Sequence, residues 1–149
     1  MGGFSGSALA VKTGGSGDVT QSHRVWQHPK TRQRIGSGVL SNGYVYILND
    51  PGVAECFEVG TGKRIWEERL KGPGPTSDNW SSMILAGDKI YAVNQGGDAF
   101  VLKASPHFEV LATNSIPETT IASMAASNDE LFIRTYENLW RIGSKDRKP

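Results

Sequence analysis

The chain has 149 residues with 16 basic and 15 acidic side chains, so its formal net charge is +1. This balance argues against nucleic acid or an anionic membrane as a partner, because both are bound through a basic excess. The longest apolar runs, such as residues 44–48, are too short for membrane insertion. Cys56 is the single cysteine, which excludes an internal disulfide and a zinc site of four cysteines.

The two ends of the chain carry little structural signal. Residues 1–6 lack the basic start and the apolar core of a signal peptide, and a secreted parent would have lost that segment if this chain is a fragment. Residues 144–149 are polar and charged, so we expect a disordered tail. Residues 1–143 are expected to form one structural unit.

Strand and turn signals begin near the N-terminus. Residues 8–11 form a short apolar run, and residues 23–27 follow a glycine-rich stretch, which predicts two strands of an incomplete sheet. Asn42-Gly43 then marks a hairpin turn, because both residues tolerate a positive φ. The strands of the first complete sheet are expected at residues 36–41, 44–49, 53–59 and 64–70, the last being a charged outer strand.

The same order of strand, turn and strand recurs twice towards the C-terminus. Residues 82–93 form a strand-turn-strand segment, followed by a predicted third strand at 99–103 and an outer strand at 108–112. Residues 123–133 repeat the segment around Asn128-Asp129, and a strand at 139–142 follows without an outer strand after it. The second and third sheets are therefore predicted as one complete and one partial copy of the first.

Aligned aromatic residues give the period of the repeat. Tyr46 and Tyr91 are 45 residues apart, Tyr91 and Phe132 are 41 apart, and Trp26 and Trp66 are 40 apart. Periods of about 40–50 residues with four strands each are typical of propeller blades. We predict an all-β fold: a partial β-propeller of four-stranded antiparallel blades, two full and two partial. The expected blades are residues 8–35 (partial), 36–71, 79–113 and 119–143 (partial).

Residues 61–66 read Thr-Gly-Lys-Arg-Ile-Trp, and this stretch resembles the Thr-Gly-x-x-x-Trp ending of the pyrroloquinoline-quinone (PQQ) propeller repeat. Residues 42–46 and 50–52 match earlier parts of that repeat. The resemblance covers nearly the whole chain after residue 8. The sequence as a whole is similar to the exported, BamB-like bacterial proteins. It implies a structural role, docking one blade against the next, for Trp26, Thr61, Gly62 and Trp66. The second blade departs from the motif, with Leu111 expected at the tryptophan position.

The resemblance also raises the hypothesis of bound PQQ. In quinoprotein dehydrogenases of this family the cofactor is covered by a disulfide of adjacent cysteines and polarised by calcium. A single cysteine cannot form that disulfide, so we expect no cofactor, no metal and no catalytic residues in this chain. Residues 60–63 and 36–38 resemble phosphate-binding loops only in part, and hairpin turns explain both.

The remaining reactive side chains have ordinary interpretations. His23, His28 and His107 are expected to be solvated or capping residues. Cys56 is expected to fill space in the core. We therefore expect a non-catalytic scaffold or binding module, periplasmic or otherwise exported within a larger parent, with loops 72–78 and 115–120 as contact segments. Its partners would be the remaining blades of the parent or a second copy, and other proteins. The alternatives are a fragment of a PQQ- and calcium-dependent dehydrogenase, or a sensor domain joined to a kinase or a membrane anchor.

Overall fold

The computed structural model describes residues 7–29 and 35–143, and the predicted tail at 144–149 lies outside them. The first sheet, here the N-terminal sheet, pairs β1 (Ala8–Val11) with β2 (Arg24–His28), and the short helix α1 (Thr20–His23) precedes β2. The strand predicted from residue 23 therefore starts one residue later, after the helical turn, and extends to His28.

Three further sheets follow, each an antiparallel meander in chain order. Blade 1 contains β3 (Val39–Ser41), β4 (Tyr44–Asn49), β5 (Val53–Glu58) and β6 (Arg64–Arg69). Blade 2 contains β7 (Ile84–Ala86), β8 (Lys89–Val93), β9 (Asp98–Lys103) and β10 (Val110–Ser115). Blade 3 contains β11 (Ala125–Ser127), β12 (Glu130–Arg134) and β13 (Leu139–Ile142).

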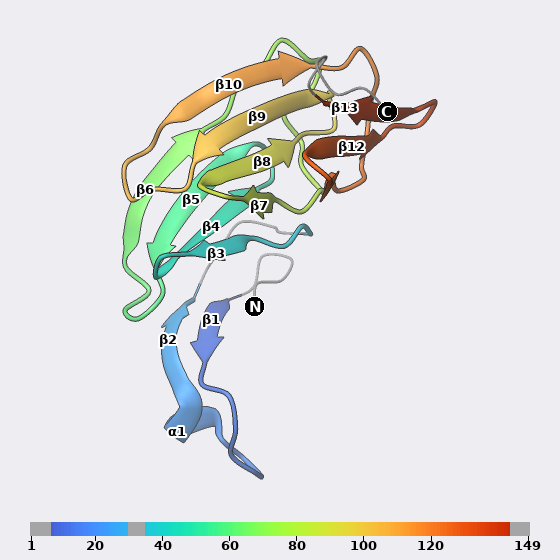
Figure 1. The fold of residues 1–149 in the computed structure, drawn as a ribbon. Helices are drawn as coiled ribbons and strands as arrows, with labels where there is room; N and C mark the ends of the chain where they lie inside the picture. The colour runs from blue at the N-terminus through green and yellow to red at the C-terminus, as the bar shows by residue number, and fades with distance from the viewer. Residues whose placement is uncertain (1–6, 30–34, 144–149) are drawn as a thin grey trace.

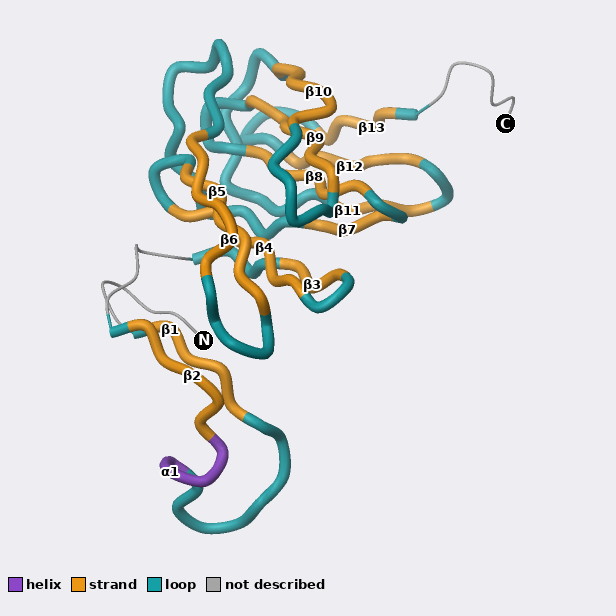
Figure 2. The backbone as a smooth tube through the Cα atoms, turned by 90° about the vertical axis from the view of Figure 1, so that its left-hand side faces the viewer, coloured by secondary structure: helices purple, strands orange, loops and turns teal. Residues whose placement is uncertain are grey.

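The sheets follow one another along an open arc, with the N-terminal sheet at one end and blade 3 at the other (Figures 1 and 2). The described residues thus form sheets of two, four, four and three strands. This arrangement confirms the predicted all-β partial propeller with two full and two partial blades. Among the described residues, no helix combines the length and the apolar character needed to span a membrane.

The register of the strands repeats from sheet to sheet. Tyr46 is paired with the first residue of β3, Tyr91 with the first of β7, and Phe132 with the first of β11. The pairing of β1 with β2 carries a shift at Ala10/Val11, as β5 with β6 does at Cys56/Phe57. Because a β-bulge marks a fixed place in a strand pair, the N-terminal sheet corresponds to the third and fourth strands of a blade.

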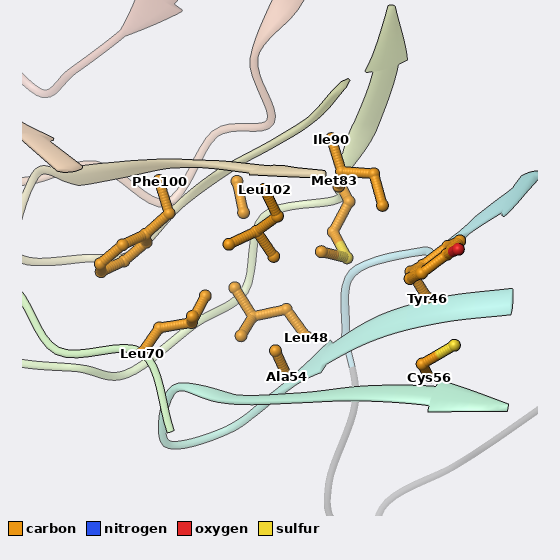
Figure 3. Packing of buried hydrophobic residues seen from close by; sticks show 10 residues of the cluster. Tyr46, Leu48, Ala54, Cys56, Leu70, Met83, Ile90, Phe100 and Leu102 are labelled. Atoms are coloured by element: carbon orange, nitrogen blue, oxygen red, sulfur yellow. The ribbon is translucent and has the colours of Figure 1, made fainter. Parts of the chain in front are cut away.

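The core lies between the sheets. Side chains alternate along each strand, so one set faces the preceding blade and the other faces the following blade. Figure 3 shows the side chains of blades 1 and 2 pointing towards one another across their interface. The buried cluster there comprises Tyr46, Leu48, Ala54, Cys56, Leu70, Met83, Ile90, Ala92, Phe100 and Leu102. A second buried cluster joins blades 2 and 3 and comprises Val93, Ile116, Met124 and Ile133.

The outer strand of blade 2 differs from its prediction. It begins at Val110 rather than at residue 108, because the preceding residues form a wide turn. The Lys103 amide donates to the Glu109 carbonyl at 3.0 Å, and the His107 amide donates to Ser105 Oγ at 3.1 Å. The residue paired with Val101 is therefore Ala112, which takes the position of Trp66, while Leu111 is the bulged residue. Placing Leu111 at the tryptophan position was wrong by one residue.

Candidate functional site: blade contacts and the linker rim

Trp66 lies at the boundary between blades 1 and 2. It is paired with Cys56 on β5, and its half-buried indole ring extends over blade 2. The ring centroid is 5.1 Å from that of Phe108 in an edge-on arrangement and 6.0 Å from that of Tyr46. Its Nε1 donates to the Ser105 carbonyl at 3.4 Å. Trp66 therefore contacts both blades with its ring and blade 2 with its polar atom.

Trp26 makes the corresponding contact one boundary earlier, between the N-terminal sheet and blade 1. Its Nε1 donates to the Val59 carbonyl at 2.7 Å. Gly62 lies directly beneath its ring: φ is +73°, and a Cβ there would lie 2.5 Å from Cδ2 of Trp26. Both the left-handed backbone and the close approach favour glycine at this position.

His28 belongs to the same contact, although the sequence indicated a solvated or capping side chain. It is half-buried, its Nε2 lies 2.7 Å from the Gly62 carbonyl, and its ring is 5.5 Å from that of Phe57. His23 is on α1 beside Ser22, and His107 is exposed in a turn of blade 2. The sequence signal for this contact was Trp26, two residues before His28, because side chains two residues apart on a strand lie on the same face.

Thr61 is placed differently from the tryptophans. Its side chain is exposed and bonds within its own turn, where Oγ1 accepts the Lys63 amide at 3.1 Å and donates to Glu58. The structure thus brings Trp26 and Gly62 together, places Trp66 at the next boundary, and leaves Thr61 as a residue that shapes a turn. The amides of that turn bond inside it, with Gly62 donating to the Glu58 carbonyl at 2.8 Å.

The linker that enters blade 2, residues 70–83, is fixed by a buried carboxylate that the sequence did not single out. Asp98 is 1% exposed. It accepts the Gly74 amide at 2.9 Å, the Asn94 side-chain amide at 3.0 Å and the Ser115 hydroxyl at 3.2 Å. A buried carboxylate is stable when several donors replace its water shell. These bonds tie the linker to the sheet.

The linker that enters blade 3, residues 116–124, is fixed by the reverse arrangement, in which the linker supplies the acceptor and the blade supplies the donors. Here the carboxylate belongs to the linker: Glu118 accepts the Thr135 hydroxyl and the Asn138 side-chain amide. The Thr135 hydroxyl bond is the main reason that the pKa of Glu118 lies below its usual range. Both linkers therefore lie at the end of the sheets that carries the turns at 94–97 and 135–138, and we call this end the linker rim.

A ladder of serines joins the segments that lead into the innermost strands, two residues before each strand begins. The Ser37 amide donates to Ser82 Oγ, and the Ser82 amide donates to Ser123 Oγ, each at 2.9 Å. The three serines are separated by 45 and 41 residues, the same intervals as the aligned aromatics. The repeat spacing was therefore a usable signal for a contact that motif comparison did not reveal.

Cys56 lies in the core between blades 1 and 2 and is fully buried. Burial raises the pKa of its thiol to about 11 and that of the neighbouring Tyr46 to about 12. A thiol that keeps its proton near neutral pH is a poor nucleophile. Asp88 lies in the turn between β7 and β8, at the end of blade 2 opposite to the linker rim. Hydrogen bonds from Lys103 and Lys89 hold the pKa of Asp88 at about 2.

Residues 7–29 and 35–143 contain no group of three histidine, cysteine, aspartate or glutamate side chains placed to hold a metal ion. Cys56 is the only cysteine of the sequence, so the disulfide of adjacent cysteines cannot form. The buried carboxylates Asp98 and Glu55 are occupied by neighbouring donors, Asn94 among those of Asp98 and Asn49 and Arg64 among those of Glu55.

Comparison with known proteins places the fold. No family model and no curated protein matches the chain. The structure of BamB from Moraxella catarrhalis matches with a TM-score of 0.66 at 14% identity, over 93% of this chain and 43% of that one. A europium-containing methanol dehydrogenase matches with a TM-score of 0.55 at 13% identity, over 73% of this chain and 21% of that one. The computationally designed Ika4 protein matches with a TM-score of 0.60 at 13% identity, over 85% and 77%.

With the sheet order described above, these likenesses define the class: the chain has a BamB- and PQQ-like β-propeller fold. It spans less than half the length of the BamB chain and about a fifth of that of the dehydrogenase, with 43% and 21% covered. At these identities the likeness concerns the fold.

Proposed function

We propose that this chain is part of a non-catalytic β-propeller that presents its linker rim to another protein. The observation that carries the proposal is the use of the buried polar groups. Asp98 accepts hydrogen bonds from the Asn94 side-chain amide and from the Gly74 amide of the linker, and it thereby fixes a loop on a rigid sheet. Rigid sheets that hold loops in place are the usual setting for recognition sites.

The contact segments proposed from the sequence lie on this rim. Residues 72–78 and 115–120 border a groove of about 290 Å³ whose walls include Pro73, Pro75 and Pro117. Proline restricts the backbone, so these loops lose little conformational freedom when a partner binds. The groove walls and the fixed linkers support a role in binding a partner rather than in catalysis.

The parent of this module is proposed to be a larger, exported bacterial protein, periplasmic by analogy with the BamB-like fold. The remaining blades of that parent, or a second copy of the chain, would cover the two end sheets. The open face of blade 3 supports this arrangement: Phe132 is at the position of Tyr46, and Leu139, which is paired with Arg134 two residues further along β12, is 69% exposed. Apolar surface of this kind is usually covered by a neighbour.

The alternative is a piece of a quinone-dependent dehydrogenase, which the likeness to a methanol dehydrogenase favours. The experiment is a titration of the purified chain with PQQ in calcium-containing buffer, followed by quinone absorbance and by reduction of a dye with methanol as substrate. The scaffold proposal expects no saturable change. A saturable absorbance change with dye reduction would refute it and establish the enzyme.

A further inference from the structure

A cavity of about 340 Å³ lies between blades 2 and 3. Blade 2 contributes Tyr91 and Val101 to its wall, and blade 3 contributes Ile133 and Trp140. No described residue of the wall carries a charge. Sites for small molecules have volumes of about 300–1,000 Å³ and mostly apolar walls. The cavity therefore has the size and the lining of a small-molecule site.

The same wall positions form a filled core one boundary earlier. Tyr91 is paired with Val101 as Tyr46 is paired with Cys56, and each tyrosine is also paired with the first residue of its innermost strand. Tyr46 and Cys56 are fully buried in the cluster between blades 1 and 2, part of which Figure 3 shows. Tyr91 is only partly buried against the smaller cluster between blades 2 and 3. The cavity is therefore a local loss of packing at an interface that otherwise repeats.

Blade 3 supplies the opposite wall in the same register. Leu131 is paired with Ile142 as Ile90 is paired with Leu102 in blade 2. Ile90 and Leu102 are buried, whereas Ile142 is 43% exposed. Asn114, another wall residue, is exposed on β10. Because β10 and β13 are the last strands of their sheets, solvent reaches the cavity from the outer side of the two blades.

The missing packing coincides with a missing ring. Ala112 is paired with Val101 where Trp66 is paired with Cys56. The indole of Trp66 fills the boundary between blades 1 and 2, and that of Trp26 contacts blade 1 at the boundary before it. Ala112 carries only a methyl group, so the boundary between blades 2 and 3 lacks the indole that the two preceding boundaries contain.

The geometry of Trp66 shows where a ring at position 112 would lie. The Trp66 ring centroid is 6.0 Å from that of Tyr46, which has the same register as the cavity residue Tyr91. A ring carried by Ala112 in the same way would therefore lie beside Tyr91 and enter the cavity.

We propose that this cavity binds an uncharged aromatic molecule of one or two fused rings, about the size of indole, which supplies the ring that Ala112 lacks. Tyr91 and Trp140 favour a ring as the occupant, because aromatic groups attract one another in edge-on or offset arrangements. The uncharged wall disfavours an ion, which would lose its hydration without compensation. The exposed amide of Asn114 is placed to bond a polar substituent at the solvent side. The inference does not depend on the partner proposed for the linker rim.

The test is a titration of the full chain with fluoroindole, followed by fluorine NMR. We expect saturable binding of one molecule per chain, and saturating fluoroindole should raise the unfolding midpoint because it binds the folded state alone. Unlabelled indole should displace the probe. Zwitterionic tryptophan, which has the same ring system and two charges, should require a concentration about tenfold higher or more.

The variant Ala112→Trp places the chain's own indole in the cavity. It should raise the Kd for fluoroindole about tenfold or more, because ring and ligand compete for one space, and it should raise the unfolding midpoint of the free chain. Ala112→Phe introduces a smaller ring and should raise Kd less. The matched control is Thr113→Trp, which adds the same ring to the next residue of β10; Thr113 is exposed and points to the other face of the sheet. It should leave Kd within about twofold.

The absence of saturable binding to the unsubstituted chain overturns the inference, and this measurement needs no variant to fold. Equal displacement by indole and by zwitterionic tryptophan also overturns it. The same holds for an unchanged Kd in Ala112→Trp and Ala112→Phe proteins that retain the circular dichroism of the parent chain, or for an equal rise of Kd in Thr113→Trp.

Discussion

Replacing Trp66 by alanine should destabilise the boundary between blades 1 and 2. Truncating a fully buried tryptophan costs about 3–5 kcal/mol, and Trp66 is half-buried, so about 2 kcal/mol is expected from packing. The edge-on contact with Phe108, at 5.1 Å between centroids, adds about 1 kcal/mol. The sum is about 3 kcal/mol, which for a chain of this size lowers Tm by about 6–12 °C.

The chain supplies a matched control in Trp80, which is 44% exposed and lies on the rim. Trp80→Ala removes the same ring from outside both buried clusters, so by the same scaling it should cost about 1 kcal/mol less than Trp66→Ala. Urea unfolding followed by circular dichroism compares the two, and Phe108→Ala in the Trp66→Ala background should show a coupling of about 1 kcal/mol. Equal losses for the two tryptophan variants, or a loss below 1 kcal/mol for Trp66→Ala, would refute the docking role.

Other perturbations test the rest of the scaffold. Gly62→Ala should cost about 2 kcal/mol more than Gly87→Ala in urea unfolding, because both have positive φ but only Gly62 lies against a tryptophan ring; equal costs would contradict the close approach. Asp98→Ala should cost about 2–4 kcal/mol and speed hydrogen exchange at the Gly74 amide, which loses its acceptor; unchanged exchange would remove Asp98 from linker fixation. With the Cys56 pKa at about 11 in the folded state and about 8.5 unfolded, the folded state retains the proton at higher pH. Stability should then fall as pH rises through that interval, less steeply in Cys56→Ala, and an identical slope in both proteins would contradict burial of the thiol.

The architecture was predictable because local signals and the repeat agree. Asn42-Gly43 specifies a hairpin, and φ of Asn42 is indeed positive, at +49°. The spacing of Tyr46 from Tyr91 gives the blade period, and both residues occupy the same register. When turn chemistry, alternation and period point to one answer, sequence reasoning is dependable.

The misplaced outer strand of blade 2 shows where such reasoning ends. Leu111 was expected at the position of Trp66, but the turn before β10 is one residue longer than the turn before β6, while the bulge is common to both blades. A register shift of one residue moves a side chain to the other face of the sheet. The sequence alone does not reveal the length of a turn that is fixed by hydrogen bonds such as that from the Lys103 amide to the Glu109 carbonyl.

The Asp98 network and the contact of His28 were missed for a related reason. Both join segments that are distant in sequence, 24 residues for Asp98 with Gly74 and 34 for His28 with Gly62. A single aspartate or histidine carries no periodic signal, so only the arrangement of the sheets reveals its partner. The serine ladder is the exception, because its members recur at the blade period.

The contrast between core and rim indicates where function resides in this fold. A blade interface requires only apolar side chains of suitable volume, so proteins with unlike functions can share it. The linker rim is the contrasting part of the molecule, because its loops are fixed by polar contacts such as that of Asp98 with the Gly74 amide rather than by apolar volume. The side chains of those loops can therefore change while the blade interfaces stay the same, which is why the rim is the place to look for the function of this fold.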